Sequence, residues 1–315
     1  DPNKIIKKPN KEYWDSILSN SLSPLTNRSL QGLYSPGSTF KMIVAIAALK
    51  YGVINSNSTH SCSGKIEFGD RLYHCWKTNG HGKMDVTNAI TQSCDVFFYE
   101  ISKKLGIDKI AKVAEDFGLG QIFDISMPNQ KKGIIPSKKW KKNTLGESWY
   151  AGETLISGIG QGFVLTNPFQ LAVMTSIIAS DGKIVEPTIL KSKNINFKTN
   201  SKYSEEIKII KKAMFNVVNV NKGTAFKSRL QDVKFSGKTG TSQVRSISLS
   251  ERESDEFRKK EQEWKNRDHA LFVGYIPYDD PQYAISVIIE HGGSGASTAA
   301  PIAKQVFNYI HKLNL

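Results

Sequence analysis

The chain has 315 residues, of which 39% are hydrophobic and 23% charged, so it is neither disordered nor fibrous and is long enough for one large domain or two closely packed lobes. Its net charge of +14 suits an anionic partner such as a polyanionic wall or a membrane surface, or else reflects lysines spread over solvated faces. No basic run is interleaved with aromatic residues and no apolar run is long enough to cross a membrane, so we expect no nucleic-acid partner and no spanning segment.

Periodic apolar residues bounded by glycine and proline predict a mostly helical first two thirds of the chain. Irregular segments are expected at 56–83 and at 120–150, and a strand interrupted by Pro187 at 184–190. The expected helices are a short one around Trp14 and Ile17, then 42–49, 86–91, 96–105, 108–117, 169–180 and 205–218.

The last third of the chain changes to strand patterns. The stretch 246–268 carries many charges of both signs and is expected to be a solvated excursion between paired strands. This order predicts an α+β fold, with an antiparallel sheet flanked by helices, a mostly helical lobe and the active site between the lobes. The expected elements are strands at 233–241, 270–276 and 283–291, a turn at Asp279-Asp280-Pro281, and a closing helix at 298–309.

One stretch combines a chain break with an apolar helix. Pro36 and Gly37 precede the helix, which places Ser38 in its first turn and Lys41 one turn further on the same face. A Ser-x-x-Lys spacing usually means a helix cap followed by a surface lysine. Here the helix that follows is too apolar for a surface helix, so Lys41 is expected to be buried. A hydroxyl beside an amine at the positive end of a helix dipole suits an activated nucleophile.

Three short motifs follow one another in the order used by serine acyl-transferases: Ser38-x-x-Lys41, Ser93-x-Asp95 and Lys238-Thr239-Gly240. We expect four catalytic residues: Ser38 as nucleophile, Lys41 as base, and Ser93 with Lys238 as the relay to the leaving nitrogen. The expected oxyanion donors are the backbone N–H groups of Ser38 and Thr241. The expected substrate-binding residues are Asp95, Thr239 and Thr241, with Gly240 leaving room for a substrate backbone along the strand.

Besides the three motifs, stretches shared with one known protein family lie along essentially the whole chain. They are Asp1-Pro2-Asn3, Asn27-Arg28, Gln31-Gly32, 35–41, Trp76, Gly80-His81-Gly82, 93–99, 158–162, 236–241 and 269–272. With them the chain resembles the transpeptidase domain of class B penicillin-binding proteins, and most closely the penicillin-binding protein 2 subfamily of the cell-elongation machinery. The second motif ends in Asp95 where most relatives carry Asn, and the elongation subfamily commonly has Asp there.

The resemblance implies a peptidoglycan D,D-transpeptidase that cross-links stem peptides ending in D-Ala-D-Ala, and inhibition by β-lactams that acylate Ser38. It implies no organic cofactor, and two kinds of partner, a SEDS-type glycosyltransferase and the elongation scaffold. Residues 1–315 would form one transpeptidase domain at the periplasmic face of the bacterial inner membrane. A membrane anchor and a pedestal region would lie N-terminal to this chain.

The three cysteines are the sequence's candidate metal ligands. Cys75, His81 and Cys94 resemble the spacing at which some members of this subfamily hold zinc with Asp, His and Cys ligands, and Cys62 lies where a fourth ligand is expected. We favour a structural zinc ion, because an odd number of cysteines does not pair off. The alternatives are a Cys62–Cys75 disulfide with Cys94 free, or three inert buried thiols. Asp70 and His74 are alternative ligands.

The alternative functions are a class D-like serine β-lactamase, a β-lactam sensor and, less favoured, a non-catalytic interaction module. A β-lactamase needs a second base to activate water. Glu147 and Glu153 lie in the corresponding region without a spacing that marks them as that base, and we expect them to be solvated loop carboxylates.

Overall fold

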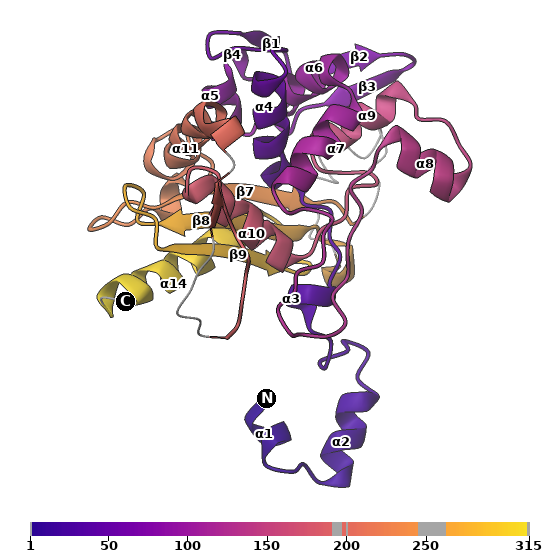
Figure 1. Cartoon of the computed structure of the whole chain (residues 1–315), viewed down its shortest axis with the longest axis vertical. Coiled ribbons are helices and arrows are strands. Elements are labelled where there is room, and N and C mark those ends of the chain that lie inside the picture. The colour runs from indigo at the N-terminus through magenta and orange to yellow at the C-terminus, as the bar shows by residue number, and fades with distance from the viewer. Residues whose placement is uncertain (1, 191–196, 200, 245–262, 314–315) are drawn as a thin grey trace.

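The structure, a computed structural model, describes residues 2–190, 197–199, 201–244 and 263–313. Within these ranges the chain forms a helical lobe packed on a three-stranded sheet, which is the α+β arrangement expected from the sequence (Figure 1). An N-terminal arm with α1 (Pro2–Ile6) and α2 (Lys11–Leu18) extends from this body, and α3 (Arg28–Gln31) leads into it. None of the described helices combines the length and apolar character needed to cross a membrane.

The helical lobe is organised around α4 (Lys41–Lys50). Its residues 42–48 are completely buried because every one of them is apolar, so this helix has no solvent-facing side over two turns. A short 3-10 turn, η1 (Gly37–Phe40), precedes it and carries Ser38. The helices packed against α4 are α5 (Val86–Thr91), α6 (Asp95–Leu105), α7 (Ile107–Asp116) and α11 (Ser204–Asn219), all near their expected positions.

The sheet has the order β7–β8–β9 and is antiparallel throughout. Its strands are β7 (Ser236–Ser242), β8 (His269–Ile276) and β9 (Tyr283–Ile289), which confirms the three expected strands with shifts of a few residues at their ends. Among the described residues β7 pairs only with β8, so it is an edge strand, the kind of strand to which another chain can be added. Two further helices pack on the sheet, α10 (Pro168–Ala179) and α14 (Ala300–Lys312), the latter after a π-helical turn, η5 (Gly295–Ala299).

The segment 56–83, expected to be irregular, contains two antiparallel ribbons. β1 (His60–Cys62) pairs with β4 (Gly82–Met84), and β2 (Lys65–Phe68) pairs with β3 (Arg71–His74). β2 alternates polar and apolar residues over only four positions and the other three strands show no such alternation, so the prediction of irregular structure was wrong here.

The basic segment 120–150 includes a helix, α8 (Lys138–Leu145), which was also missed. Ser137 caps its start by accepting a hydrogen bond from the Trp140 N–H, and Gly146 ends it in a left-handed conformation. Its lysine-rich sequence lacks an apolar stripe, and the buried side chain is a lysine, Lys141. The next helix, α9 (Ala151–Gly158), leads to the glycine-rich turn.

Two other segments differ from expectation. The strand expected at 184–190 is limited to β5 (Lys183–Val185), ending before Pro187, and it pairs with β6 (Phe197–Thr199). Most of the charged stretch 246–268 lies outside the described residues, and its described end contains the short turn η4 (Trp264–Asn266). The remaining 3-10 turns are η2 (Ser201–Tyr203) and η3 (Phe226–Ser228).

Candidate active site

The turn that carries Ser38 is held against the edge strand β7. Gly37 has a φ of +52°, and a Cβ at this position would clash with the carbonyl oxygen of Thr241. The Gly37 N–H also donates to the carbonyl of Gly160, 2.9 Å away, in the glycine-rich turn after α9. Glycine is therefore required here both for its backbone conformation and for the close approach to β7.

Lys41 is the first residue of α4 and its side chain is fully buried. Its Nζ donates to the Ser93 carbonyl at 3.0 Å and lies 3.3 Å from the Ser93 Oγ. The shortest contact of this amine is an ion pair with Asp95, 2.7 Å from Nζ to Oδ1. Burial of Lys41 was predicted from the apolar helix, and its three partners explain how an ammonium is tolerated there.

Ser93 lies between two lysines. Its Oγ is 2.9 Å from the Lys238 Nζ, in addition to the Lys41 contact. Ser93 has a φ of +57°, a left-handed conformation that is strained for serine and typical of residues held in place at functional sites. The second and third motifs, 145 residues apart, therefore meet at one hydroxyl group.

Lys238 is completely buried on β7. Its Nζ also donates to the Thr239 carbonyl at 2.9 Å. Burial lowers the pKa of Lys238 well below its ordinary value, and the positive charge of Lys41 lowers it further, while Asp95 opposes the shift. A lysine in this environment gives up its proton more readily than an exposed one, which suits a group that shares a proton with Ser93.

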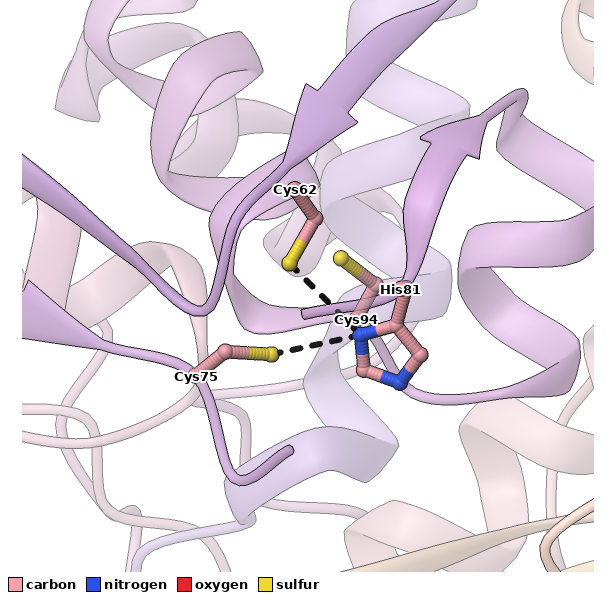
Figure 2. Close-up of side chains that lie close together, drawn as sticks. All are labelled: Cys62, Cys75, His81 and Cys94. Atoms are coloured by element: carbon pink, nitrogen blue, oxygen red, sulfur yellow. Dashed lines mark hydrogen bonds between the residues drawn. The ribbon is translucent and has the colours of Figure 1, made fainter. Parts of the chain in front are cut away.

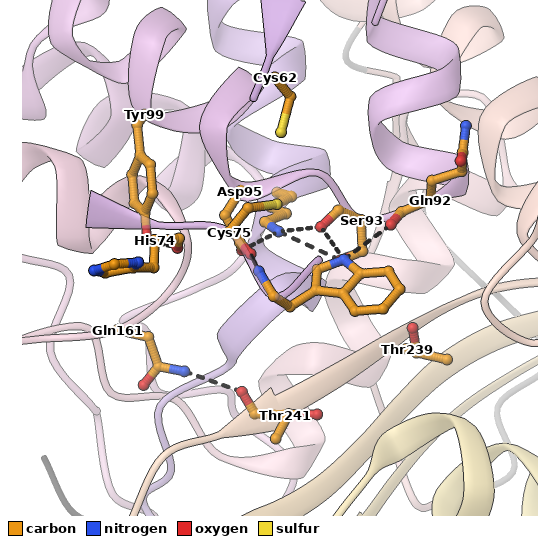
Figure 3. Close-up of polar contacts among 12 residues, drawn as sticks. Cys62, His74, Cys75, Gln92, Ser93, Asp95, Tyr99, Gln161, Thr239 and Thr241 are labelled. Atoms are coloured by element: carbon orange, nitrogen blue, oxygen red, sulfur yellow. Dashed lines mark hydrogen bonds and ion pairs between the residues drawn. The ribbon is translucent and has the colours of Figure 1, made fainter. Parts of the chain in front are cut away.

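Asp95 has hydrogen-bond partners within the protein that the motif does not indicate. The motif predicts a substrate-binding role, but both carboxylate oxygens are occupied: Oδ1 by Lys41 and Oδ2 by the backbone N–H of Trp76 at 2.8 Å (Figure 3). Asp95 lines the cleft with a side chain that is only 12% exposed. Its main partner within the protein is therefore the lysine of the first motif, and the substrate contact expected of Asp95 stays a prediction.

Gly240 on β7 also makes a close contact within the protein that the motif does not indicate. A Cβ at this position would approach Thr39 Cγ2 at 2.9 Å and the Pro36 carbonyl at 3.1 Å, so the glycine makes room for the nucleophile turn. It lines the cleft as well, together with its neighbours Thr239 and Thr241. The space on the side of its missing Cβ is thus filled by the nucleophile turn, and the pairing of a substrate backbone with this strand stays a prediction.

A cleft of about 720 Å³ brings the predicted residues together. Its lining comes from the helical lobe, with Ser38, Ser93 and Asp95, and from the sheet, with 239–241. The threonines of β7 are fixed from both sides. The Thr239 hydroxyl is 2.7 Å from that of Thr224, and Gln161 Nε2 donates to the Thr241 carbonyl at 3.0 Å (Figure 3).

Two lining residues had no role in the sequence-based prediction. Trp76 donates its indole N–H to the carbonyls of Ser93 at 3.0 Å and Gln92 at 3.1 Å, so it holds the strained loop on which Ser93 lies. Thr224 orients Thr239, as described above. Trp76 was visible only as a matching residue, whereas no motif identifies Thr224, which lies in a turn between α11 and η3.

The glutamates considered as a second base lie elsewhere. Glu153 pairs with the buried Lys141 at 2.5 Å and accepts a hydrogen bond from the Tyr150 N–H at 2.9 Å at the start of α9. It is therefore a structural carboxylate, which corrects the expectation of a solvated one. The Glu147 side chain is 60% exposed, as expected, and lies 3.3 Å from the same lysine. Neither glutamate lines the cleft.

Cys62, Cys75, His81 and Cys94 form one cluster next to the cleft (Figure 2). Their potential ligand atoms all lie within 4.8 Å of one another, and His81 Nδ1 is 3.6 Å from the Cys62 sulfur and 3.4 Å from that of Cys75. All three cysteines are buried free thiols, so Cys62 and Cys75 do not form a disulfide. The alternative ligands Asp70 and His74 are outside this cluster of described residues.

The cluster favours negative charge on sulfur. Cys75 and Cys94 share a hydrogen bond that lowers the pKa of Cys75 and raises that of Cys94, and His81 lowers the pKa of Cys75 further. One thiolate is therefore held between a thiol and an imidazole. Cys94 separates Ser93 from Asp95, so this cluster adjoins the catalytic loop directly.

Comparison with known proteins places this geometry in a family. The penicillin binding protein transpeptidase domain family matches residues 1–308. The peptidoglycan D,D-transpeptidase MrdA of Haemophilus influenzae is 33% identical over 98% of the chain. The alignment covers 49% of that relative, so the chain spans about half the length of the curated relatives it matches.

Solved structures agree with this assignment. The structure of PBP2 from Helicobacter pylori in complex with MreC has a TM-score of 0.87 at 31% identity and covers 97% of this chain and 54% of its own. PBP2 of Pseudomonas aeruginosa in complex with WCK 5153 has a TM-score of 0.83 at 34% identity, covering 98% of this chain and 65% of its own. The chain belongs to the penicillin-binding protein transpeptidase domain family.

Proposed function

We propose that this domain is a peptidoglycan D,D-transpeptidase that works through an acyl-enzyme on Ser38. The observation that carries the proposal is the convergence of Lys41 and Lys238 on the Ser93 hydroxyl, at 3.3 and 2.9 Å, within a cleft that Ser38 lines. The family membership and the D,D-transpeptidase activity for which the Haemophilus influenzae relative is named support it.

In acylation, the Ser38 Oγ bonds to the carbonyl carbon of the donor peptide and the C–N bond to its terminal D-Ala breaks. Lys41 accepts the Ser38 proton, and Asp95, 2.7 Å away, takes up a proton from Lys41 as it does so. Ser93 passes a proton to the leaving amine and is resupplied by Lys41, directly or through Lys238, and Asp95 then returns its proton to Lys41. The net movement is one proton from Ser38 to the leaving D-Ala.

In transfer, the amine of a second peptide attacks the ester carbonyl. A C–N bond forms, the bond to Ser38 Oγ breaks, and the proton lost by the amine returns to Ser38 through the same groups. Backbone N–H groups of Ser38 and Thr241 are the oxyanion donors, a role supported by the close approach of Gly37 to Thr241.

The carboxylate of the donor peptide binds at β7. The hydroxyls of Thr239 and Thr241 border the cleft, and Lys238 lies below them with its amine directed to Ser93 and Thr239. The donor backbone pairs with the open outer side of β7, as an added strand would. β-Lactams, which resemble the donor, acylate the same serine.

Cys62, Cys75, His81 and Cys94 hold a structural zinc ion in this proposal. Three sulfurs and one imidazole nitrogen within 4.8 Å of one another fit the four-coordinate sites that zinc forms in proteins. The thiolate favoured at Cys75 adds the required negative charge. When bound, the ion cross-links the two ribbons to the loop that carries Ser93, and it takes no part in the chemical steps.

The partners and location remain proposals of the same kind. The Helicobacter pylori relative was solved with MreC, which supports an elongation scaffold as a partner of this chain. A SEDS-type glycosyltransferase and the periplasmic face of the inner membrane follow from the resemblance. Co-purification of the full-length protein with each partner, compared with the 315-residue chain, tests where the contacts lie.

The test of the activity uses a peptide ending in D-Ala-D-Ala and a second peptide with a free amine. A transpeptidase releases D-Ala and forms the joined peptide, and Ser38→Ala abolishes both products. Release of D-Ala with hydrolysis alone indicates a carboxypeptidase, and rapid turnover of a penicillin indicates a β-lactamase. Absence of every product, with a folded protein, indicates the non-catalytic alternative.

A further inference from the structure

A second cavity adjoins the catalytic cleft. It has a volume of about 630 Å³ and lies between the β2–β3 hairpin and the start of α9. Arg71, Tyr73 and Ile156 line both this cavity and the cleft, so the two are continuous at these residues. The hairpin and β7 both contribute to the cleft lining, the hairpin with 71–74 and β7 with 239–241.

The walls of this cavity combine aromatic rings with two charges that have no ion pair among the described residues, Arg71 at the junction with the cleft and Asp70 in the second cavity alone. Phe68, Tyr73, Tyr150 and Phe163 contribute rings suited to the alkyl part of a peptide side chain. Glu153 is neutralised by Lys141, and Asp70 lines only the second cavity.

Arg71 is the cation at the junction. It is exposed, and within the described part of the chain its guanidinium has no hydrogen bond or ion pair. A guanidinium left unpaired at the mouth of a cavity suits a carboxylate, which it can hold with two parallel hydrogen bonds. The expected ligand therefore carries a carboxylate and an apolar portion.

The reaction itself requires a second peptide site. While the donor is attached to Ser38 and paired along β7, the attacking amine must enter from another side of the cleft. With the donor occupying β7, the hairpin provides the space, the apolar surface and the positive charge of Arg71 for the second peptide. We propose that the cavity bounded by Arg71 is the acceptor subsite, which binds an amine-bearing peptide through its carboxylate. This inference rests on the proposed transpeptidase function.

The experiment measures binding of an acceptor to the 315-residue chain. The probe is acetyl-glycyl-lysyl-D-alanine, which has one free amine and one carboxylate, and its C-terminal amide is the control ligand. Titration calorimetry is carried out on the chain after acylation with penicillin, which fills the donor site, and on the untreated chain. Arg71→Gln is compared with Lys65→Gln, which removes the same charge from the same hairpin outside both cavities.

We expect the free acid to bind the wild-type chain at least about tenfold more tightly than the amide, because only the acid makes the charge-assisted bonds. Arg71→Gln should remove this preference, Arg71→Lys should restore part of it, and Lys65→Gln should keep it. Penicillin acylation should be unchanged in all three variants. In acyl transfer, Arg71→Gln should raise KM for the acid acceptor without changing kcat.

Equal binding of acid and amide by the wild-type chain, or an unchanged preference in Arg71→Gln, would overturn the acceptor subsite. Slower penicillin acylation in Arg71→Gln would place Arg71 in the donor site instead and would equally refute it. Absence of any penicillin adduct on wild-type Ser38 would reject the proposed transpeptidase function. The acceptor subsite is tested separately, by comparing how the untreated chain binds the acid and the amide.

Discussion

Lys41 and Asp95 form a buried ion pair, 2.7 Å from Nζ to Oδ1, that links the first motif of the site to the second. The lysine begins α4 and the aspartate begins α6. The other oxygen of Asp95 accepts the Trp76 N–H, so this carboxylate also ties the base to the loop after Cys75. The position of the Lys41 amine therefore depends on Asp95.

The first prediction concerns this pair. Asp95→Asn should lower the free energy of unfolding by about 3 kcal/mol, because it leaves a buried ammonium without its counter-charge. Lys41→Met combined with Asp95→Asn should be less destabilised than the sum of the single variants by at least about 1 kcal/mol. Urea unfolding of the four proteins measures this coupling.

The control for this cycle is Asp181→Asn, which breaks the ion pair between the exposed Asp181 and Lys211 and should cost less than about 1 kcal/mol. If the two substitutions at Lys41 and Asp95 were additive, the ion pair would have no energetic significance.

The second prediction is a pH dependence caused by Lys238. Its pKa in the folded protein lies below the ordinary value of 10.5, so between these two values the unfolded chain binds more protons than the folded one. The contribution of Lys238 to stability therefore rises with pH across that window, and the cost of burying its charge is greatest below it. In urea unfolding between pH 7 and 10, the free energy of unfolding of Lys238→Met should therefore rise less with pH than that of the wild-type chain. If the free energy of unfolding of the two proteins changed with pH in parallel, the pKa of Lys238 would not be lowered in the folded protein.

The third prediction concerns Trp76. Trp76→Phe keeps an aromatic ring but loses the indole N–H that binds the carbonyls of Gln92 and Ser93. Acylation of Ser38 by penicillin should slow about tenfold, while the free energy of unfolding falls by no more than about 1.5 kcal/mol. Trp264→Phe, at an exposed position outside the cleft, should leave the rate unchanged. Equal rates in all three proteins would remove Trp76 from the positioning of Ser93.

The fourth prediction concerns the cysteine cluster. Elemental analysis should find about one zinc ion per chain, and removal by a chelator should release three titratable thiols and lower the Tm. Acylation of Ser38 should also slow, because Cys94 lies within the loop that presents Ser93. A chain without zinc that shows a Cys62–Cys75 disulfide by mass spectrometry would contradict the metal site.

The fifth prediction compares two glycines with similar backbone conformations. Gly37 has a φ of +52° and Gly52 a φ of +67°, but only Gly37 faces a neighbouring atom, the Thr241 carbonyl, at close range. Gly52→Ala should cost about 1 kcal/mol from backbone strain alone. Gly37→Ala should cost at least about 3 kcal/mol and abolish acylation, because the nucleophile turn must move from β7. Similar costs in calorimetric unfolding would show that the close approach is unimportant.

Long elements with strong patterns were predicted well from the sequence. The run 42–48 is apolar at every position and is buried in α4. The strands β8 and β9 lie where β-branched and aromatic residues are concentrated, in two runs separated by a turn. Elements without such patterns were missed, namely the two short ribbons and the lysine-rich α8. Their stability comes from tertiary contacts such as the burial of Lys141, which periodicity does not reveal.

The site shows the same division. Ordered motifs identified Ser38, Lys41, Ser93 and Lys238, because the chemistry demands those residue types at fixed spacings. The partners of each side chain could not be predicted, since Asp95 meets Lys41 across 54 positions and Gly240 leaves room for Thr39 of the nucleophile turn. Contacts of this kind are fixed by the packing of η1 against β7 and of α6 against α4, and only the folded chain displays them.

The most direct test of the central claim is the reaction of the chain with a labelled penicillin, followed by peptide mass spectrometry. A stable adduct on Ser38, lost in Ser38→Ala and persisting for many minutes, is the predicted result. An adduct on another residue, or no adduct on a folded protein, would contradict the assignment of Ser38 as the nucleophile of a transpeptidase.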